Sequence, residues 1–90
     1  MTADEMVAVA RLADHYERHS VIDDPLATAK HDFLKFKREA PQVWRHLYES
    51  KMDSRELGDW MYAFILRWSK SGLSFKNFAA EWADENLRRA

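Results

Sequence analysis

Apolar residues recur along this chain at intervals of three and four positions, which is the spacing of one face of an α-helix. The first such segment follows Thr2 and Glu5, whose spacing is that of a capping box. It predicts a helix that runs to about His19. The residues expected on its buried side are Met6, Val9, Ala13 and Tyr16.

Asp24 and Pro25 predict the start of a second helix, because an acidic N-cap followed by proline at the first helical position favours helix initiation. Pro41 ends that helix near Glu39, since its ring clashes with a preceding helical turn. The same proline can open a short third helix that runs to about Ser50. The apolar residues expected inside are Leu26, Ala29, Phe33 and Phe36 in the second helix, and Val43, Trp44, Leu47 and Tyr48 on one side of the third.

Two aromatic helices are predicted over residues 54–89. The fourth helix starts with an acidic turn at Asp53, which suits the positive end of a helix dipole. Gly72 provides a left-handed stop, and Ser74 is a suitable N-cap for the fifth helix, which is expected to end at Arg88-Arg89. The apolar residues expected inside are Leu57, Trp60, Met61, Phe64 and Trp68, followed by Phe75, Phe78, Ala79 and Trp82.

Chain length and composition agree with this pattern. Ninety residues make one small domain, and two glycines and two prolines leave little room for disordered linker. We therefore predict an all-α fold, a compact single-domain helical bundle of four to five short helices over residues 1–90. The absence of cysteine excludes disulfides, thiolate zinc sites and thiol nucleophiles.

No targeting or membrane segment is evident. Residues 1–5 are acidic and lack the basic-then-apolar order of a signal peptide. The longest nearly apolar run, residues 60–66, is far shorter than the roughly 20 residues needed to cross a bilayer. We expect a soluble, cytoplasmic protein that does not enter a membrane.

Charge is distributed unevenly although the net charge is only −1. Residues 1–24 carry six acids and two bases, and residues 25–51 carry six bases and three acids. The two segments are expected either to attract each other within the fold or to orient a partner. The basic face of residues 30–45 is interleaved with Leu34, Trp44 and Tyr48. Its cations are Lys30, Lys35, Lys37, Arg38 and Arg45.

This basic face has three interpretations. Arginine beside tryptophan and tyrosine is favoured at protein interfaces. The same composition can clamp a nucleic-acid backbone with stacking support. The third interpretation is a solvated helix face without a partner.

The turn of the 54–89 hairpin resembles a DNA-binding helix-turn-helix. The matching positions are Gly72, Leu73, Ser74 and Phe78. Trp68 departs from the motif, which usually has a small residue there. The outer face of the fifth helix, formed by Asn77, Glu81, Asp84 and Arg88, carries two carboxylates that a phosphate backbone would repel. Lys70, Lys76 and Asn77 would make the contacts if the hairpin bound nucleic acid, but a plain helical hairpin is the favoured interpretation.

His15 and His19 lie four residues apart and share one helix face. Glu17 is at the wrong position for the zinc-protease motif, and a third ligand from Asp23 or Asp24 would require the connector to fold back. We therefore expect solvent-exposed histidines and no metal. No motif for catalysis or cofactor binding occurs, and a small helical array has little room for a pocket of roughly 300 Å³ or more. We expect no enzyme activity.

Tyr62 and Leu66 project away from the main apolar sector of the fourth helix. A helix that is apolar nearly all round is either central to its domain or covered by a partner. The sequence thus favours a small regulatory protein that binds another protein, of the adaptor or inhibitor type seen in bacteria and phages. The alternatives are a DNA- or RNA-binding regulator and a helical homo-oligomer such as a homodimer.

Overall fold

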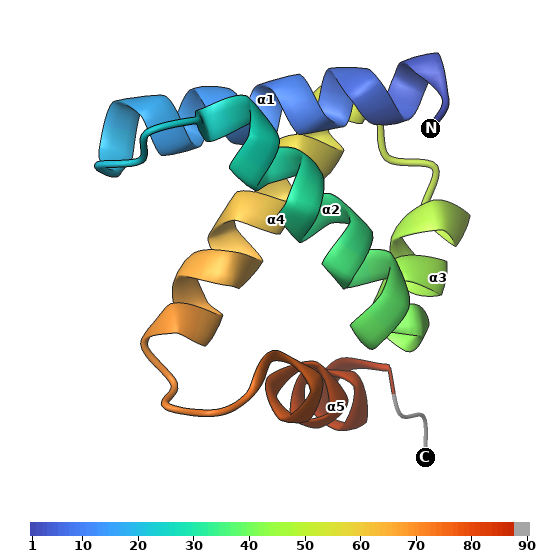
Figure 1. Cartoon of the computed structure of the whole chain (residues 1–90). Coiled ribbons are helices and arrows are strands. Elements are labelled where there is room, and N and C mark those ends of the chain that lie inside the picture. Colours follow the sequence, from blue (N-terminus) through green and yellow to red (C-terminus); the bar gives the residue numbers. More distant parts are fainter. Residues whose placement is uncertain (88–90) are drawn as a thin grey trace.

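The computed structural model describes residues 1–87, and this part of the chain contains five helices and no strand (Figure 1). The fold class is therefore all-α, as the hydrophobic pattern predicts. The helices are α1 (Ala3–His19), α2 (Pro25–Glu39), α3 (Pro41–Glu49), α4 (Ser54–Ser69) and α5 (Phe75–Asn86). The predicted end of the last helix at Arg88-Arg89 lies outside the described residues.

Four of the helix starts use a side-chain cap, because the first backbone N–H groups of a helix have no partner within it. In α1, the Thr2 hydroxyl accepts the Glu5 N–H at 3.1 Å and the Glu5 carboxylate accepts the Thr2 N–H at 2.9 Å, which is a complete capping box. The capping side chains of α2, α4 and α5 are Asp24, Asp53 and Ser74. The predicted helix starts are confirmed.

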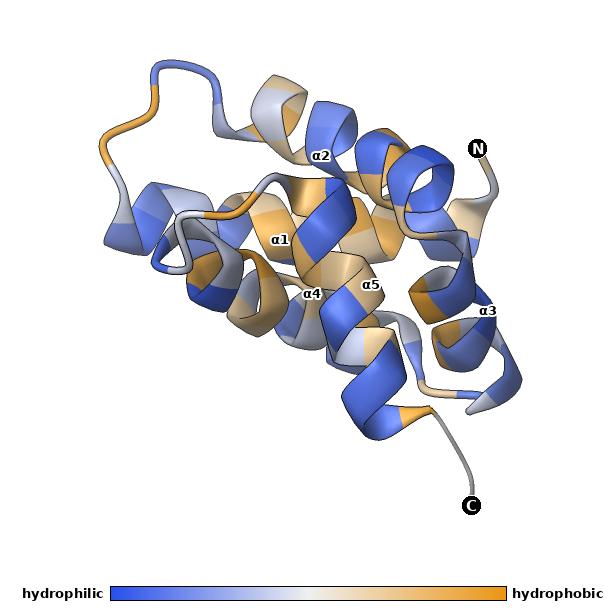
Figure 2. Cartoon of the chain, turned by 90° about the horizontal axis from the view of Figure 1, so that it is seen from below, coloured by the Kyte–Doolittle hydropathy of each residue, from blue (hydrophilic) through white to orange (hydrophobic). Residues whose placement is uncertain are grey.

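The helices pack around α1, α2 and α4. Helix α1 contacts both α2 and α4, while α5 packs against α2 and α3 at the end of the molecule away from α1 (Figure 1). Hydrophobic faces turn inward and hydrophilic faces outward (Figure 2). The molecule is compact, with a radius of gyration of 12.8 Å against about 12 Å expected for its length.

Aromatic rings form the centre of the core. Phe33, Phe36 and Phe64 are completely buried, and the Phe36 and Phe64 rings lie 5.1 Å apart. Trp60 stacks on Phe64 at 5.1 Å and meets the Trp82 ring edge-on at 5.4 Å. Such offset and edge-to-face pairs add to the stabilisation from burial. The tryptophans of the last two helices therefore organise the core.

Gly58 allows α1 and α4 to approach each other closely. A Cβ atom at this position would lie 2.6 Å from the Arg11 Cβ and 2.8 Å from the Ala8 carbonyl oxygen. Both distances are far shorter than ordinary contacts of about 3.5–4 Å. The crossing of α1 over α4 thus depends on a residue without a side chain.

Two residues expected in the core are exposed. Leu26 is 48% exposed, since it lies in the first turn of α2 beside a shallow hollow lined by Asp14 and Glu17. Tyr48 is 76% exposed on the outer side of α3, although Val43 and Leu47 of the same helix are buried. At both positions the apolar pattern predicts burial, but no other helix covers the side chain.

Opposite charges attract within the fold, as one interpretation of the charge distribution predicts. The Lys37 ammonium lies 2.9 Å from the Glu5 carboxylate and joins the basic segment to the acidic N-terminal one. The Tyr16 hydroxyl donates a 2.6 Å hydrogen bond to Asp32, which also connects α1 to α2.

None of the five helices between residues 1 and 87 has both the length and the apolar character that a membrane crossing requires.

Candidate binding groove between α1, α3 and α4

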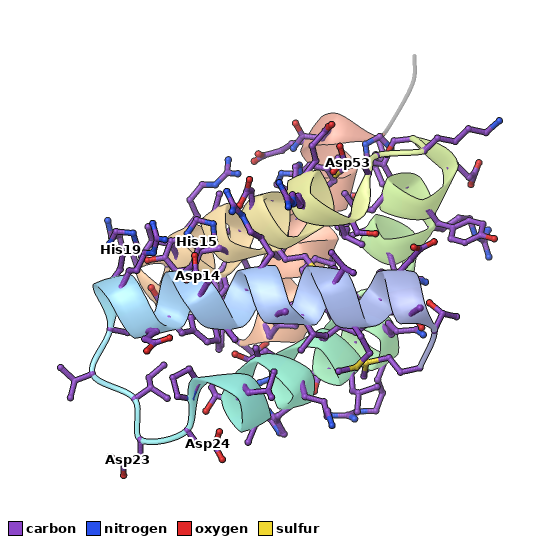
Figure 3. All side chains as sticks on the ribbon, turned by 90° about the horizontal axis from the view of Figure 1, so that it is seen from above. Asp14, His15, His19, Asp23, Asp24 and Asp53 are labelled. Atoms are coloured by element: carbon purple, nitrogen blue, oxygen red, sulfur yellow. The ribbon has the colours of Figure 1, made fainter. Side chains whose placement is uncertain are left out.

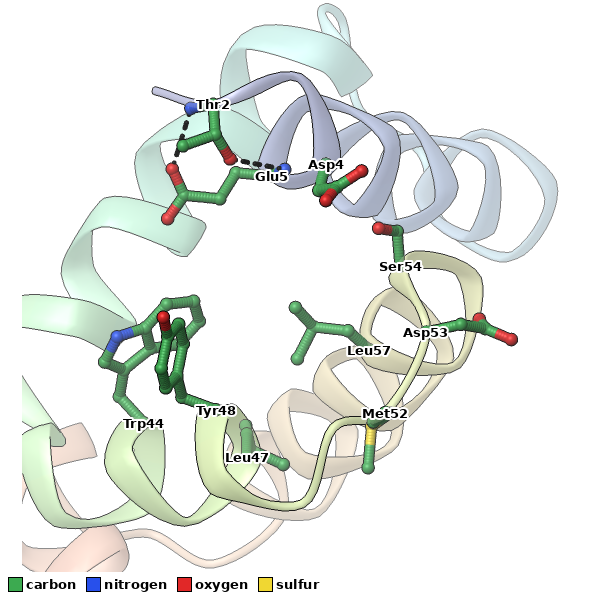
Figure 4. A pocket seen from close by; sticks show the side chains of 10 residues that line it. All are labelled: Thr2, Asp4, Glu5, Trp44, Leu47, Tyr48, Met52, Asp53, Ser54 and Leu57. Carbon is green, nitrogen blue, oxygen red and sulfur yellow. Dashed lines mark hydrogen bonds between the residues drawn. The ribbon is translucent and has the colours of Figure 1, made fainter.

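A groove of about 540 Å³ opens where the start of α1, the second half of α3 and the start of α4 meet (Figure 4). Its volume falls within the range of about 300–1,000 Å³ that is usual for binding sites. The expectation that so small a helical array has little room for a pocket is therefore wrong. The helices splay apart at this end of the molecule because α3 is short and leaves their termini uncovered.

Local backbone structure positions the three walls. The capping box fixes Thr2 and Glu5 on the α1 wall. After α3, Lys51 adopts a left-handed conformation (φ 56°), and this turn brings Met52 and Asp53 to the start of α4. Such a conformation is uncommon for a residue with a side chain. The turn also separates α3 from α4, a point that the hydrophobic pattern leaves open.

Apolar side chains form one part of the groove. Leu47 is buried, whereas Trp44 and Leu57 are half-buried and retain contact with the groove. Trp44 and Tyr48 lie one helical turn apart on α3 and both line the groove, with Leu57 across the opening (Figure 4). Trp44 is held in place by an edge-on contact with Phe33 at 5.4 Å. The exposed Tyr48 ring thus extends an apolar surface that begins in the core.

Carboxylates form the other part. Asp4, Glu5 and Asp53 line the groove, and no basic side chain occurs among its described lining residues. The hydrogen bond from Lys37 lowers the pKa of Glu5. The pKa of Asp53 is lowered chiefly by the hydrogen bond that its carboxylate accepts from the Glu56 N–H. Glu5 and Asp53 therefore stay charged at neutral pH.

Beside the groove, the Asp53 and Glu56 carboxyl groups lie close to each other. The pKa of Glu56 is raised, first by its hydrogen bond with Asp53 and then by the charge of that carboxylate. Asp59 adds to this effect one turn further along α4. The start of α4 thus carries two neighbouring carboxyl groups, Asp53 and Glu56, with the Arg55 charge close to Asp53.

Tyr62 and Leu66, the predicted interaction pair on α4, have different surroundings. Tyr62 is half-buried because α1 lies over it, and its ring stacks on His15 at 4.6 Å. Leu66 is 42% exposed. The pair therefore does not form one free surface, and only Leu66 is largely available to a partner.

His15 is not the solvent-exposed residue that the sequence suggests. Its Nε2 lies 2.6 Å from the Asp59 carboxylate, which also accepts a 2.7 Å hydrogen bond from Arg11. Both contacts lower the pKa of Asp59, that from Arg11 most. His19 is exposed and lies next to His15 near the end of α1 (Figure 3). Among residues 1–87, no three potential metal ligands are grouped to hold an ion.

The basic face of residues 30–45 is divided by intramolecular contacts. The Lys35 ammonium lies over the Trp68 ring at 5.0 Å, and Lys37 pairs with Glu5. Arg38 lies 3.5 Å from its neighbour Glu39, and both Arg38 and Arg45 are exposed. These cations do not form one uniform surface, because two of the lysines are engaged with the core aromatics and with α1.

The turn between α4 and α5 is held together by Trp68. Gly72 has a φ of 74°, as the sequence predicts for the helix stop. The Trp68 indole N–H donates a 2.8 Å hydrogen bond to the Leu73 carbonyl, and its ring packs on Phe75 at 5.2 Å. The large Trp68 side chain therefore stabilises the turn through this hydrogen bond and this ring contact.

The residues considered for nucleic-acid contact at this turn are exposed. They are Lys70, Lys76 and Asn77. Glu81 and Asp84, which oppose such contact, are exposed as well. Arg88, predicted on the same outer face, lies outside the described residues.

Comparison of the chain with protein-family models, with curated proteins and with solved structures gives no match. The groove is therefore interpreted from its own residues. The sequence indicates only helix capping for Thr2, Glu5 and Asp53. It places Trp44 and Tyr48 both on the apolar side of the third helix and within the basic face of residues 30–45, whose arginine, tryptophan and tyrosine are typical of protein interfaces.

Proposed function

We propose that this is a non-catalytic regulatory protein of the cytoplasm that binds another protein, as an adaptor or inhibitor, through the groove between α1, α3 and α4. The observation that carries the proposal is that buried Leu47, half-buried Trp44 and Tyr48, which is 76% exposed, all line the same groove. Tyrosine and tryptophan at the edge of a hollow are characteristic anchors of protein interfaces.

The shape of the groove favours a protein over a small molecule as its occupant. Its three walls come from helix ends, and Tyr48 stands at its outer edge, so a partner can reach the aromatic surface from outside. Nucleic acid is disfavoured here, because Asp4 and Asp53 would repel phosphates.

Site-specific photo-cross-linking tests the proposal. A photoreactive phenylalanine analogue at position 48 should cross-link a protein in host lysate, whereas the same analogue at position 73 should not. Leu73 is a suitable control because it is 39% exposed and lies in the α4–α5 turn, at the other end of α4. Nuclease treatment should leave the cross-link intact.

The single substitution Tyr48→Ala completes the test. It should abolish capture of that protein while leaving the circular dichroism spectrum and the melting temperature nearly unchanged, since the side chain is mostly exposed. Equal cross-linking at positions 48 and 73, or nuclease-sensitive capture at position 73, would argue against the groove as the binding site.

A further inference from the structure

We infer that the segment held in the groove is a cationic amphipathic peptide segment, with apolar side chains against Trp44 and Tyr48 and lysine or arginine beside Asp4 and Asp53. This inference rests on the proposed function and specifies the chemistry of the partner. Two independent features of the groove support it, namely its charge and the placement of its apolar wall.

The charge of the groove favours a cationic occupant. Of its three lining carboxylates, Glu5 is already paired with Lys37, Asp4 is exposed at the rim, and Asp53 is exposed with the Arg55 charge near it. Glu56 adds a carboxyl group next to Asp53, and the pKa of Glu56 is raised first by its hydrogen bond with Asp53 and then by the charge of that carboxylate. A cation placed there would be attracted by the two carboxyl groups, whereas an anion would be repelled.

The helix N-termini of α1 and α4 do not reverse this preference. Each carries a partial positive charge of about half an elementary charge. The Thr2 hydroxyl and the Asp53 carboxylate already accept N–H groups there, so these donors are not free to bind an anion. The full charges of Asp4 and Asp53 therefore outweigh the two partial charges.

The apolar wall requires that the occupant be amphipathic. Trp44 and Tyr48 of α3 lie across the opening from the α1 carboxylate Asp4, and Leu57 lies on the α4 side (Figure 4). A purely basic, highly hydrated segment would leave these side chains exposed. A segment with apolar residues on one side and cations on the other would contact both parts of the groove at once. Amphipathic helices bind hydrophobic grooves in this way.

Two short synthetic peptides test the inference. They share the same leucine and tryptophan positions, and one carries lysine where the other carries glutamate. The lysine peptide should bind measurably by fluorescence anisotropy, and its affinity should fall with added salt. The glutamate peptide should bind at least tenfold more weakly. Equal binding of both, or no binding of the lysine peptide, overturns the inference.

Charge-neutralising substitutions locate the binding. Asp4→Asn and Asp53→Asn should each weaken binding of the lysine peptide about two- to fivefold, which is the usual effect of an exposed ion pair. Asparagine also preserves the helix cap at position 53. The matched control is Glu17→Gln, because Glu17 is an exposed carboxylate on the same helix as Asp4, about 20 Å along it. An equal effect of Glu17→Gln would show only general attraction and refute the site.

Failure of this inference can be told apart from failure of the proposed function. If position 48 cross-links a protein but the lysine peptide fails to bind, the groove is a protein-binding site with a different chemistry. If the analogue at position 48 cross-links no protein and Tyr48→Ala leaves capture unchanged, the groove itself is not the binding site.

Discussion

The substitution Gly58→Ala tests the α1–α4 contact, because two opposite effects act at this position. Alanine favours a helix over glycine by about 1 kcal/mol in a helix interior. Against this, the added Cβ would lie 2.6 Å from the Arg11 Cβ and 2.8 Å from the Ala8 carbonyl oxygen. Neither atom can move away by a side-chain rotation, since both are fixed to the α1 backbone.

The steric effect should therefore win. Restoring an ordinary contact requires α1 and α4 to separate by about 1 Å, and overpacking of this kind costs about 1–3 kcal/mol, occasionally more. The separation also stretches the 2.7 Å contact between Arg11 and Asp59. After subtracting the helix-propensity gain, we expect a net loss of about 1–2 kcal/mol, because the two short contacts place the strain at the upper end of that range.

Thermal unfolding followed by circular dichroism measures this loss. For a chain of this size, about 1 kcal/mol corresponds to a fall in Tm of about 4–8 °C, so Gly58→Ala should melt at least several degrees lower. Asn77→Ala, at an exposed site in α5, serves as a control that alters helix propensity without creating a clash. An increase in Tm for Gly58→Ala would mean that the two helices do not approach as closely as described.

Three further substitutions test other contacts. Tyr16→Phe removes the buried hydroxyl that donates to Asp32 at 2.6 Å and should lower the unfolding free energy in urea by about 1–2 kcal/mol; an unchanged value would show that this hydrogen bond is unimportant. The pKa of Asp59 is lowered in the folded state, so its stabilising effect is complete above about pH 4 and is lost as pH falls through the lowered value. Asp59→Asn should accordingly flatten the decline in stability measured between neutral and acidic pH, and an identical pH profile would contradict this. Leu66→Asp should lower Tm by no more than about 4–8 °C, because Leu66 is 42% exposed and its partial burial contributes about 1 kcal/mol. If a homodimer forms through this side chain, ultracentrifugation should show its loss. A larger fall in Tm would place Leu66 in the core.

Local signals along the sequence predict the helices well. Thr2 with Glu5, Asp24 with Pro25, and Ser74 act through hydrogen bonds or backbone restraints within a few residues, so their consequences are visible without knowledge of the fold. The same holds for Gly72, whose positive φ is a local property. Helix boundaries were accordingly predictable.

The groove was not predictable in this way, because its walls come from three separate parts of the chain. The apolar pattern marks Tyr48 as an inward residue, but only the position of α3 relative to α1 and α4 decides whether anything covers it. Likewise, the pairing of His15 with Asp59 joins residues that are 44 positions apart. Such contacts depend on the crossing of helices, which helical periodicity does not specify.

The capping box at the start of α1 has a practical consequence for labelling. Because Thr2 and Glu5 anchor the first turn beside the groove, a tag fused ahead of Met1 would begin at the proposed binding groove and would compete with the partner that we propose. The α4–α5 turn is a better position, since α4 carries it about 24 Å from the groove. The chain has no cysteine, so Lys70→Cys would supply a unique thiol there, and a dye attached to it would report on binding without obstructing it.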